Sequence, residues 1–342
     1  MAEVNRQILL RKRPVGVPTI GDFEAAEAAV NLPEVGEVLL RNLYLSVDPA
    51  IRGWMSDAKS YLPPIGIGEP IRSGTLSQVV ESRAEGWRVG QVVQALAAWE
   101  SYSVVSSRML HGKVKPMKGI PLSTMLSVLG GTGLTAYFGL LEIGQPKAGE
   151  TVLVSAAAGG VGSIVGQIAK IKGCRTAALT GSDEKCGWLT EKLGYDAAIN
   201  YKTTDVRLAL KDACPEGIDV FFDSVGGEIL DTALTCLNRH GRVVVCGAIS
   251  QINEAELPAG PSNYLQLLAK SARMEGFTTL DFASRYEEAR ADLARWIRDG
   301  QIRYRDDIVE SLDEAPAQLL RLFSGEHRGK LLVKLADAEG WE

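Results

Sequence analysis

From about residue 151 onward, short apolar runs alternate with segments of helical periodicity. The apolar runs predict strands at residues 151–155, 175–180, 197–200, 218–223, 242–247 and 273–279. The segments between them predict helices at 163–172, 183–193, 205–213, 229–237 and 263–271, and a further helix follows at 285–298. Six strands with intervening helices are typical of a doubly wound parallel sheet, which binds its ligand at the carboxyl ends of the strands.

The first 120 or so residues have a different pattern. Runs rich in β-forming residues occur at 38–45, 71–82, 91–98 and 101–105, and Gly and Pro break them, which predicts an irregular β-rich domain. A helix is expected at 316–323 and a last strand at 331–335. Because the six-strand unit is already complete, we expect that strand to return to the first domain. The predicted domains are therefore 1–128, 129–302 and a C-terminal return at 303–342.

Composition narrows the class of protein. The chain has 342 residues, of which 46% are hydrophobic and 23% are charged, as expected for a globular protein of about two domains. A net charge of -5 argues against a nucleic-acid partner. No apolar run has the length of a membrane span, and residues 1–13 lack a signal-peptide core. Five scattered cysteines predict free thiols, so we expect a cytoplasmic protein with no membrane partner.

Zinc is not expected. A structural zinc lobe needs four closely spaced cysteines. The first 170 residues contain no cysteine and a single histidine, His111. The sequence therefore predicts neither a structural nor a catalytic zinc ion.

A glycine-rich turn follows the first strand of the predicted parallel sheet. Residues 156–162 have the pattern A-x-x-G-x-x-G, with Ala156 where the commoner dinucleotide fingerprint has its first glycine. Such a turn brings backbone N–H groups and a helix N-terminus to a pyrophosphate. A purely structural turn is the alternative, and the strand–turn–helix context favours the cofactor.

Three further loops follow strands of the same sheet. After the second strand, Gly181 and Ser182 stand where NAD-binding proteins often have an acid, and Lys185 follows. A hydroxyl and a lysine suit a 2′-phosphate, which favours NADPH over NADH; the alternative is an exposed lysine in a helical first turn. The loops at 223–227 and 246–250 contain glycines that allow a nicotinamide ribose to approach, or they are ordinary strand-to-helix turns.

Several segments together resemble a known family. They are residues 45–52 (LSVDPAIR), 132–137 (TGLTAY), 156–163 (AAAGGVGS), 181–185 (GSDEK), 200–202 (NYK), 225–227 (VGG) and 246–250 (CGAIS). In this order they are similar to the zinc-independent medium-chain dehydrogenase/reductases, and within these to the leukotriene B4 12-hydroxydehydrogenase/prostaglandin reductase family with its alkenal and curcumin reductases. The resemblance runs from about residue 5 to residue 335.

The resemblance implies an α/β protein with a Rossmann doubly wound domain and a GroES-like β-rich catalytic domain, often a homodimer. It implies NADPH-dependent reduction of a carbon–carbon double bond conjugated to a carbonyl. Hydride goes to the β-carbon of an enone or enal, and the enolate is protonated at the α-carbon. The implied cofactor-binding residues are Gly159, Gly160, Val161 and Gly162 at the pyrophosphate; Ser182, Lys185 and Tyr201 at the 2′-phosphate; and Ser224, Cys246, Gly247, Ala248, Ile249, Ser250, Phe277, Thr278, Thr279 and His327 towards the nicotinamide.

The chain departs from the family pattern at four positions. Ala50 and Ile252 stand where tyrosines that border the substrate pocket are usual, so we expect a less polar pocket there. Ser224 and His327 replace asparagines. His327 could donate to the nicotinamide amide, or it is an exposed turn histidine.

The remaining hydrogen-bond donors for the developing enolate are few. Tyr264, a further predicted pocket residue, and Tyr61 are the candidate catalytic residues. Tyr264 could instead fix the next helix through Leu267 and Leu268, and Tyr61 could be a surface aromatic. No general acid is obligatory, since water or a cofactor ribose hydroxyl can supply the proton.

Three other functions stay open at this point. A quinone oxidoreductase would share every cofactor motif, and its product would be a hydroquinone. A non-catalytic NADPH-binding protein is compatible with the loss of the two tyrosines. An alcohol dehydrogenase is disfavoured by the missing zinc ligands.

Overall fold

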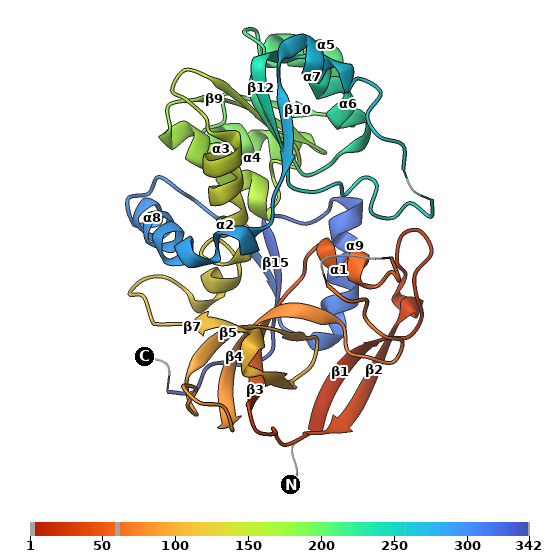
Figure 1. Ribbon diagram of the computed structural model, residues 1–342, viewed down its shortest axis with the longest axis vertical. Helices are drawn as coiled ribbons and strands as arrows, with labels where there is room; N and C mark the ends of the chain where they lie inside the picture. Colours follow the sequence, from red (N-terminus) through yellow and green to blue (C-terminus); the bar gives the residue numbers. More distant parts are fainter. Residues whose placement is uncertain (1–3, 59–61, 257, 341–342) are drawn as a thin grey trace. The chain divides into compact units, whose positions relative to one another are not determined.

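The computed structural model describes residues 4–58, 62–256 and 258–340, which form two compact units. The first combines residues up to Ser127 with those from Asp306 onward, and the second runs from Val128 to Arg305. Figure 1 shows the elements of both. Among the described helices, none is long and apolar enough to cross a membrane.

The second unit is built on a six-stranded sheet in which every neighbouring pair is parallel. Its strands are β8 (Thr151–Val154), β9 (Arg175–Thr180), β10 (Ala197–Asn200), β11 (Ile218–Asp223), β12 (Leu237–Val245) and β13 (Arg273–Gly276). Their order across the sheet is β10-β9-β8-β11-β12-β13. This is the doubly wound order 3-2-1-4-5-6, which reverses between β8 and β11 and leaves a crevice there. The predicted α/β class is confirmed, and all six predicted strands are present with shifted ends. The last one stops at Gly276 and not at residue 279, and β12 begins at Leu237, which the sequence pattern assigns to a helix.

Helices precede, connect and follow these strands. They are α2 (Gly131–Phe138), α3 (Gly160–Ile171), α4 (Asp183–Leu193), α5 (Val206–Ala213), α6 (Gly227–Thr235), α7 (Leu265–Lys270) and α8 (Tyr286–Arg298), with η4 (Gly139–Gly144) and η5 (Thr279–Arg285). Leu210 of α5 and Leu234 of α6 pack with Leu153 and Phe221 of the sheet in one buried cluster. Figure 1 shows α5, α6 and α7 grouped together, while α3 and α4 lie beside β9.

The first unit holds a two-stranded sheet of β1 (Val4–Leu10) and β2 (Phe23–Ala29) and a seven-stranded sheet. The larger sheet contains β3 (Glu37–Ser46), β4 (Arg72–Ser82), β5 (Val92–Ala98), β6 (Tyr102–Ser106), β7 (Leu110–Lys113), β14 (Asp306–Val309) and β15 (Lys330–Lys334). The helical elements are α1 (Ala50–Trp54), α9 (Ala315–Ser324), η1 (Ile20–Asp22), η2 (Ser107–Met109), η3 (Leu122–Leu126) and η6 (Leu312–Glu314). Because β15 pairs antiparallel with β3, residues from both ends of the chain complete one sheet.

Candidate functional site

The glycine-rich turn leaves β8 at the point where the strand order reverses. Ala156 has a φ of 47°, which is the left-handed conformation that glycine adopts without steric cost and that other residues rarely adopt. Further along the turn, a Cβ atom on Gly162 would lie 2.6 Å from the carbonyl oxygen of Ala156. Only a glycine fits there, because helix and turn are in backbone contact, and the turn is thereby held close to β8.

Helix α3 begins in this turn with open N–H groups. Gly159 caps the helix and has no side chain that could accept a hydrogen bond. The first N–H groups of any helix lack a partner inside the helix, so those of Gly160, Val161 and Gly162 remain for an external acceptor. Together with the positive end of the helix dipole, they fit a pyrophosphate.

A second group of polar residues lies at the end of β9. The Ser182 hydroxyl accepts a hydrogen bond from the Lys185 backbone N–H at 3.3 Å and caps α4. A Cβ atom on Gly181 would lie 3.1 Å from the Tyr201 hydroxyl and 3.2 Å from Cε of Lys202. Burial raises the pKa of Tyr201, so its hydroxyl stays a donor. The predicted 2′-phosphate residues Ser182, Lys185 and Tyr201 therefore belong to one corner of the sheet.

Sequence reasoning missed Lys202 as a member of this corner. Its side chain follows that of Tyr201 towards Gly181, while its backbone N–H donates to Oδ1 of Asn200 at 3.2 Å. Asn200 in turn donates a hydrogen bond of 2.8 Å to the carboxylate of Asp183 in the first turn of α4. The available signal was the position of Lys202 directly after the third strand of the sheet.

On the other side of the crevice, a buried carboxylate orders the loops after β11 and β12. Asp223 is 1% exposed and accepts hydrogen bonds from the Ser155 hydroxyl at 2.7 Å and from the Val225 N–H at 2.9 Å. Burial raises its pKa despite these donors. Its backbone carbonyl accepts from the N–H groups of Cys246 at 2.8 Å and Gly247 at 3.2 Å. One residue thus links the β8 end to both loops that were predicted to face the nicotinamide.

The predicted residues of these two loops lie against one another. The N–H of Ile249 donates to the Ser224 carbonyl at 3.1 Å, and the Ser250 hydroxyl donates to the Val225 carbonyl at 2.6 Å. A Cβ atom on Gly226 would lie 3.0 Å from Cβ of Ala248. Burial raises the pKa of the Cys246 thiol to about 11, so this residue remains a neutral thiol.

The predicted segment after β13 has local structural partners. Thr278 caps η5, and its hydroxyl donates to Asp281 at 3.1 Å. The ring of Phe277 covers Gly139 of η4, where a Cβ atom would lie 2.5 Å from it. Thr279 is half-buried and begins η5. The side chains of Phe277 and Thr278 are therefore engaged within the unit, and the Thr278 N–H also donates to Asp281, at 3.1 Å.

The remaining predicted positions of the second unit are more exposed. Tyr264 precedes α7 and is 57% exposed, and Leu268 is 80% exposed, whereas Leu267 packs against the core. The expectation that both leucines fix the helix therefore holds only for Leu267. Ile252 is half-buried in the loop after β12.

In the first unit, Ala50 begins α1 and packs partly against the core. Lys330 is buried and donates to Asp48 at 2.9 Å and to the Val47 carbonyl at 2.7 Å, which fixes the segment before Ala50. Nδ1 of His327 lies 3.4 Å from the Arg321 carbonyl. Tyr61 lies outside the described residues, so its predicted role has no structural counterpart here.

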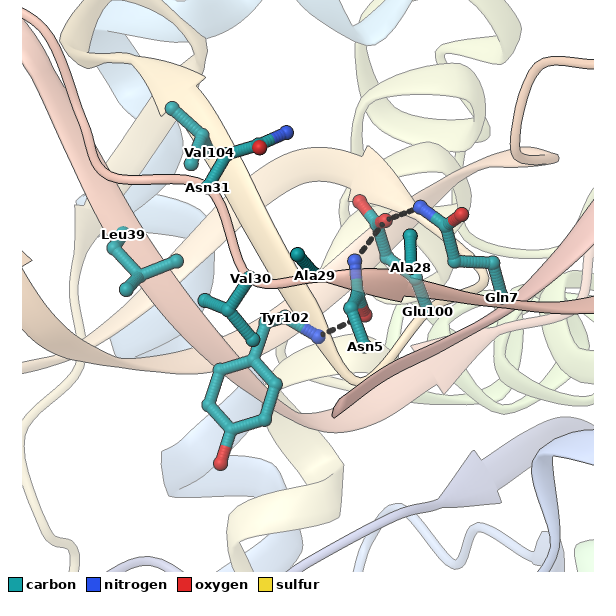
Figure 2. Close-up of a pocket in the computed structure, with 10 residues that line it drawn as sticks. All are labelled: Asn5, Gln7, Ala28, Ala29, Val30, Asn31, Leu39, Glu100, Tyr102 and Val104. Carbon is teal, nitrogen blue, oxygen red and sulfur yellow. Dashed lines mark hydrogen bonds between the residues drawn. The ribbon is translucent and has the colours of Figure 1, made fainter. Parts of the chain in front are cut away.

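A pocket of about 170 Å³ opens in the first unit between β1, β2, β3 and β6. At its base Glu100 accepts hydrogen bonds from Asn5 at 2.9 Å and Gln7 at 2.6 Å (Figure 2). Ser103 donates to the other carboxylate oxygen at 2.7 Å. None of the predicted site residues lines this pocket, and its hydrogen bonds join β1 to the seven-stranded sheet.

Across residues 4–58, 62–256 and 258–340, no group of three or more His, Cys, Asp and Glu side chains is arranged to hold a metal ion.

Comparison with known families gives two matches. Residues 6–112 match the family described as N-terminal domain of oxidoreductase. Residues 160–295 match the family described as zinc-binding dehydrogenase.

Similar proteins extend over nearly the whole chain. The NADPH-dependent curcumin reductase of Escherichia coli is 41% identical over 97% of this chain and 97% of its own length. Prostaglandin reductase 1 of Bos taurus is 42% identical over 95% of this chain and 97% of its own. The crystal structure of CurA from Vibrio vulnificus in complex with NADPH superimposes with a TM-score of 0.90 and 42% identity, covering 97% of this chain and 99% of that one.

Proposed function

The chain belongs to the medium-chain dehydrogenase/reductases, in the branch of the prostaglandin, curcumin and 2-alkenal reductases, and from this membership we propose that it is an NADPH-dependent double-bond reductase. Its substrates are α,β-unsaturated ketones and aldehydes. The observation that carries the proposal is the glycine-rich turn, with open helix N–H groups, at the reversal point of a 3-2-1-4-5-6 sheet.

NADPH fits the residues of the second unit. Gly162 keeps helix α3 in backbone contact with its turn, and the N–H groups of Gly160 to Gly162 would hold the pyrophosphate. Tyr201, Lys185 and Lys202 would hold the 2′-phosphate. No acid stands at Gly181 or Ser182 to repel that group. When bound, NADPH supplies the hydride that is transferred to the β-carbon.

The chain's own contribution is orientation and electrostatic stabilisation. Negative charge builds up on the carbonyl oxygen of the substrate, and one well-placed donor there is worth on the order of 3 kcal/mol. Tyr264 is the candidate donor, because its exposed hydroxyl follows the loop that contains Ile252. Ala50 and Ile252 would line the pocket with apolar surface. The backbone of residues 246–250 and 277–279 would border the nicotinamide, and His327 would approach it from the C-terminal segment.

We further propose that no zinc takes part. The only histidine in the first 170 residues is His111, and no cysteine occurs there. The test is metal analysis of active protein, together with activity after treatment with a strong chelator. Stoichiometric zinc whose removal abolishes turnover would contradict the proposal.

Assembly as a homodimer is also proposed. Strand β13 forms an edge of the six-stranded sheet, and all four of its residues are exposed. Exposed apolar side chains lie on and near it, at Tyr264, Leu265, Leu268, Met274 and Leu280. Together they would pair with a second copy by extending the sheet. Light scattering of wild type and of Met274→Arg tests this, and a monomeric wild-type protein would refute it.

The decisive experiment for the activity is cofactor consumption with four substrates: a small enone, an enal, an aryl enone and a quinone. NADH is run in parallel, and products are identified. Saturated carbonyl products with a preference for NADPH are expected. Turnover of the quinone alone would assign a quinone oxidoreductase. Tight NADPH binding with no turnover of any substrate would indicate a non-catalytic protein.

A further inference from the structure

Tyr195 is a buried tyrosine behind the glycine-rich turn that no motif drew attention to. It follows Gly194, the left-handed C-cap of α4, and precedes β10. The residue is 3% exposed, and its hydroxyl donates a hydrogen bond of 2.6 Å to the carbonyl oxygen of Gly162. The acceptor belongs to the glycine that keeps helix α3 close to its turn.

The hydroxyl end of the Tyr195 ring lies against α3. A Cβ atom on Gly166 would lie 1.9 Å from Cζ of Tyr195, so the ring occupies the space that any other residue at 166 would fill. The next residue, Asp196, pairs with Lys170 at 2.8 and 3.0 Å. Positions 162, 166 and 170 share one face of a helix. Tyr195 and Asp196 therefore contact α3 from its first turn to its last.

This contact joins the two halves of the adenosine side of the site. Helix α3 offers its N-terminus to the pyrophosphate, whereas α4 begins next to the 2′-phosphate residues. The two helices lie next to each other (Figure 1). Tyr195 leaves the end of α4 and holds the start of α3, so it sets the axial position of one helix relative to the other.

We propose that Tyr195 is a positioning residue for NADPH, which fixes the pyrophosphate turn through the hydroxyl bond to Gly162. This deepens the proposed function and rests on it. The Gly162 carbonyl points along the helix away from the open N–H groups of the turn. That carbonyl belongs to the peptide between Gly162 and Ser163, which adjoins the peptides that carry the N–H groups of Gly160 to Gly162. Fixing it therefore holds those N–H groups in place before the cofactor arrives.

Tyr195→Phe tests the proposal, because it removes only the hydroxyl. The dissociation constants of NADPH and of two fragments are measured by fluorescence titration. One fragment is 2′-phospho-ADP-ribose, which has the pyrophosphate, and the other is adenosine 2′-monophosphate, which has neither of its phosphates. We expect about fivefold weaker binding of NADPH and 2′-phospho-ADP-ribose, the effect of one lost hydrogen bond. Binding of adenosine 2′-monophosphate and kcat at saturating NADPH should be unchanged.

Two matched variants separate positioning from general stability. Tyr137→Phe removes another buried phenol of the same unit, whose hydroxyl bonds to Asp292 at 2.9 Å, and should leave all three dissociation constants unchanged. Lys170→Met releases the far end of α3 and should lower the thermal midpoint without a change in NADPH binding. Unchanged NADPH binding in Tyr195→Phe overturns the proposal, and so does equal weakening of both fragments. If wild type binds no NADPH, the proposed function itself fails.

Discussion

Replacing Gly162 with alanine puts a methyl group into the backbone contact between α3 and its turn. A Cβ atom there lies 2.6 Å from the Ala156 carbonyl oxygen and 2.7 Å from Cα of Ala157. Ordinary contact begins at 3.4 Å, so turn and helix must separate by about 0.8 Å, the difference between 3.4 and 2.6 Å. Both opposing atoms are backbone atoms, so no side-chain rotation can relieve the clash.

The size of the effect follows from this displacement. Overpacking of a close-packed region costs about 1–3 kcal/mol. If about 2 kcal/mol of this overpacking cost weakens NADPH binding, the dissociation constant for NADPH increases roughly 30-fold, because about 1.4 kcal/mol corresponds to a factor of ten. The KM for NADPH should rise with it, because the N–H groups of the turn no longer point at the pyrophosphate.

The assay is a fluorescence titration with NADPH, with the thermal midpoint of unfolding measured alongside. Gly187→Ala is the matched control: it lies inside α4, and its Cβ would meet only Oε1 of Glu191, at 3.8 Å. Alanine is favoured over glycine in a helix by about 1 kcal/mol, so this variant should bind NADPH normally and be no less stable. A folded Gly162→Ala protein that binds NADPH within about twofold of wild type would refute the reasoning, since the cost of overpacking predicts far more.

Ala156→Gly should raise the thermal midpoint by about 1–3 °C. The left-handed φ costs alanine about 1–2 kcal/mol, and the greater freedom of glycine in the unfolded chain offsets part of the gain from removing that strain. A lower midpoint would show that Ala156 is unstrained. Lys202→Met should reduce kcat/KM for NADPH about tenfold, because a charge-assisted hydrogen bond to the 2′-phosphate is lost. The kcat/KM for NADH should be unchanged, since NADH has no 2′-phosphate. Lys192→Met, at the other end of α4, is its control, and an equal loss with both cofactors would contradict a role at the 2′-phosphate. Partial burial by itself would raise the pKa of Asp196, but hydrogen bonds from Lys170 and from the backbone outweigh it and lower this pKa below 3.8. The ionised carboxylate therefore stabilises the fold above that pH. This stabilisation is lost as the pH falls through the pKa of Asp196 in the folded state. The thermal midpoint of Asp196→Asn should therefore lie below that of wild type at pH 7, and the difference should shrink near pH 3; a constant difference would mean that the charge is irrelevant.

The parallel sheet could be predicted because a buried strand shows in the sequence as a short run of apolar residues. Five of its six strands contain a short apolar run, whereas β13 is exposed along its length, and the glycine-rich turn stands between one such run and a helix. The sequence placed the start of the first helix at residue 163, whereas α3 begins at Gly160. Glycines are poor helix formers, and here backbone contact with the turn stabilises them.

The N-terminal ribbon could not be predicted in this way. Residues 24–29 read Glu-Ala-Ala-Glu-Ala-Ala, and both residue types favour a helix. They form most of β2 nonetheless, because β1 pairs with this strand along its whole length. Local propensity gives way to a partner that lies elsewhere in the chain.

The site shows the same division. Gly159 to Gly162 form a contiguous motif, so the sequence alone could propose them together. The side chains of Tyr195 and Lys202 lie against Gly162 and Gly181, and neither spacing nor periodicity connects the members of these pairs. Such residues become visible only when the fold brings them together.

The order of the two units along the chain has a consequence for synthesis of the protein. All residues of the second unit are contiguous, from Val128 to Arg305, and lie between two parts of the first. Strand β15 completes the first unit by pairing Leu332 with Ser46. On the ribosome the inserted unit can fold as soon as it emerges. In β3, residues 37–41 can pair with β6 early, whereas residues 44–46 must wait until β15 is translated.

Nascent chains therefore carry an unpaired sheet edge for most of translation, and such edges are prone to pair with other chains. Chains stalled after residue 305 should already resist protease over 128–305 and remain sensitive over 37–106. Equal protection of both regions at that length would show that the first unit folds without its C-terminal strands.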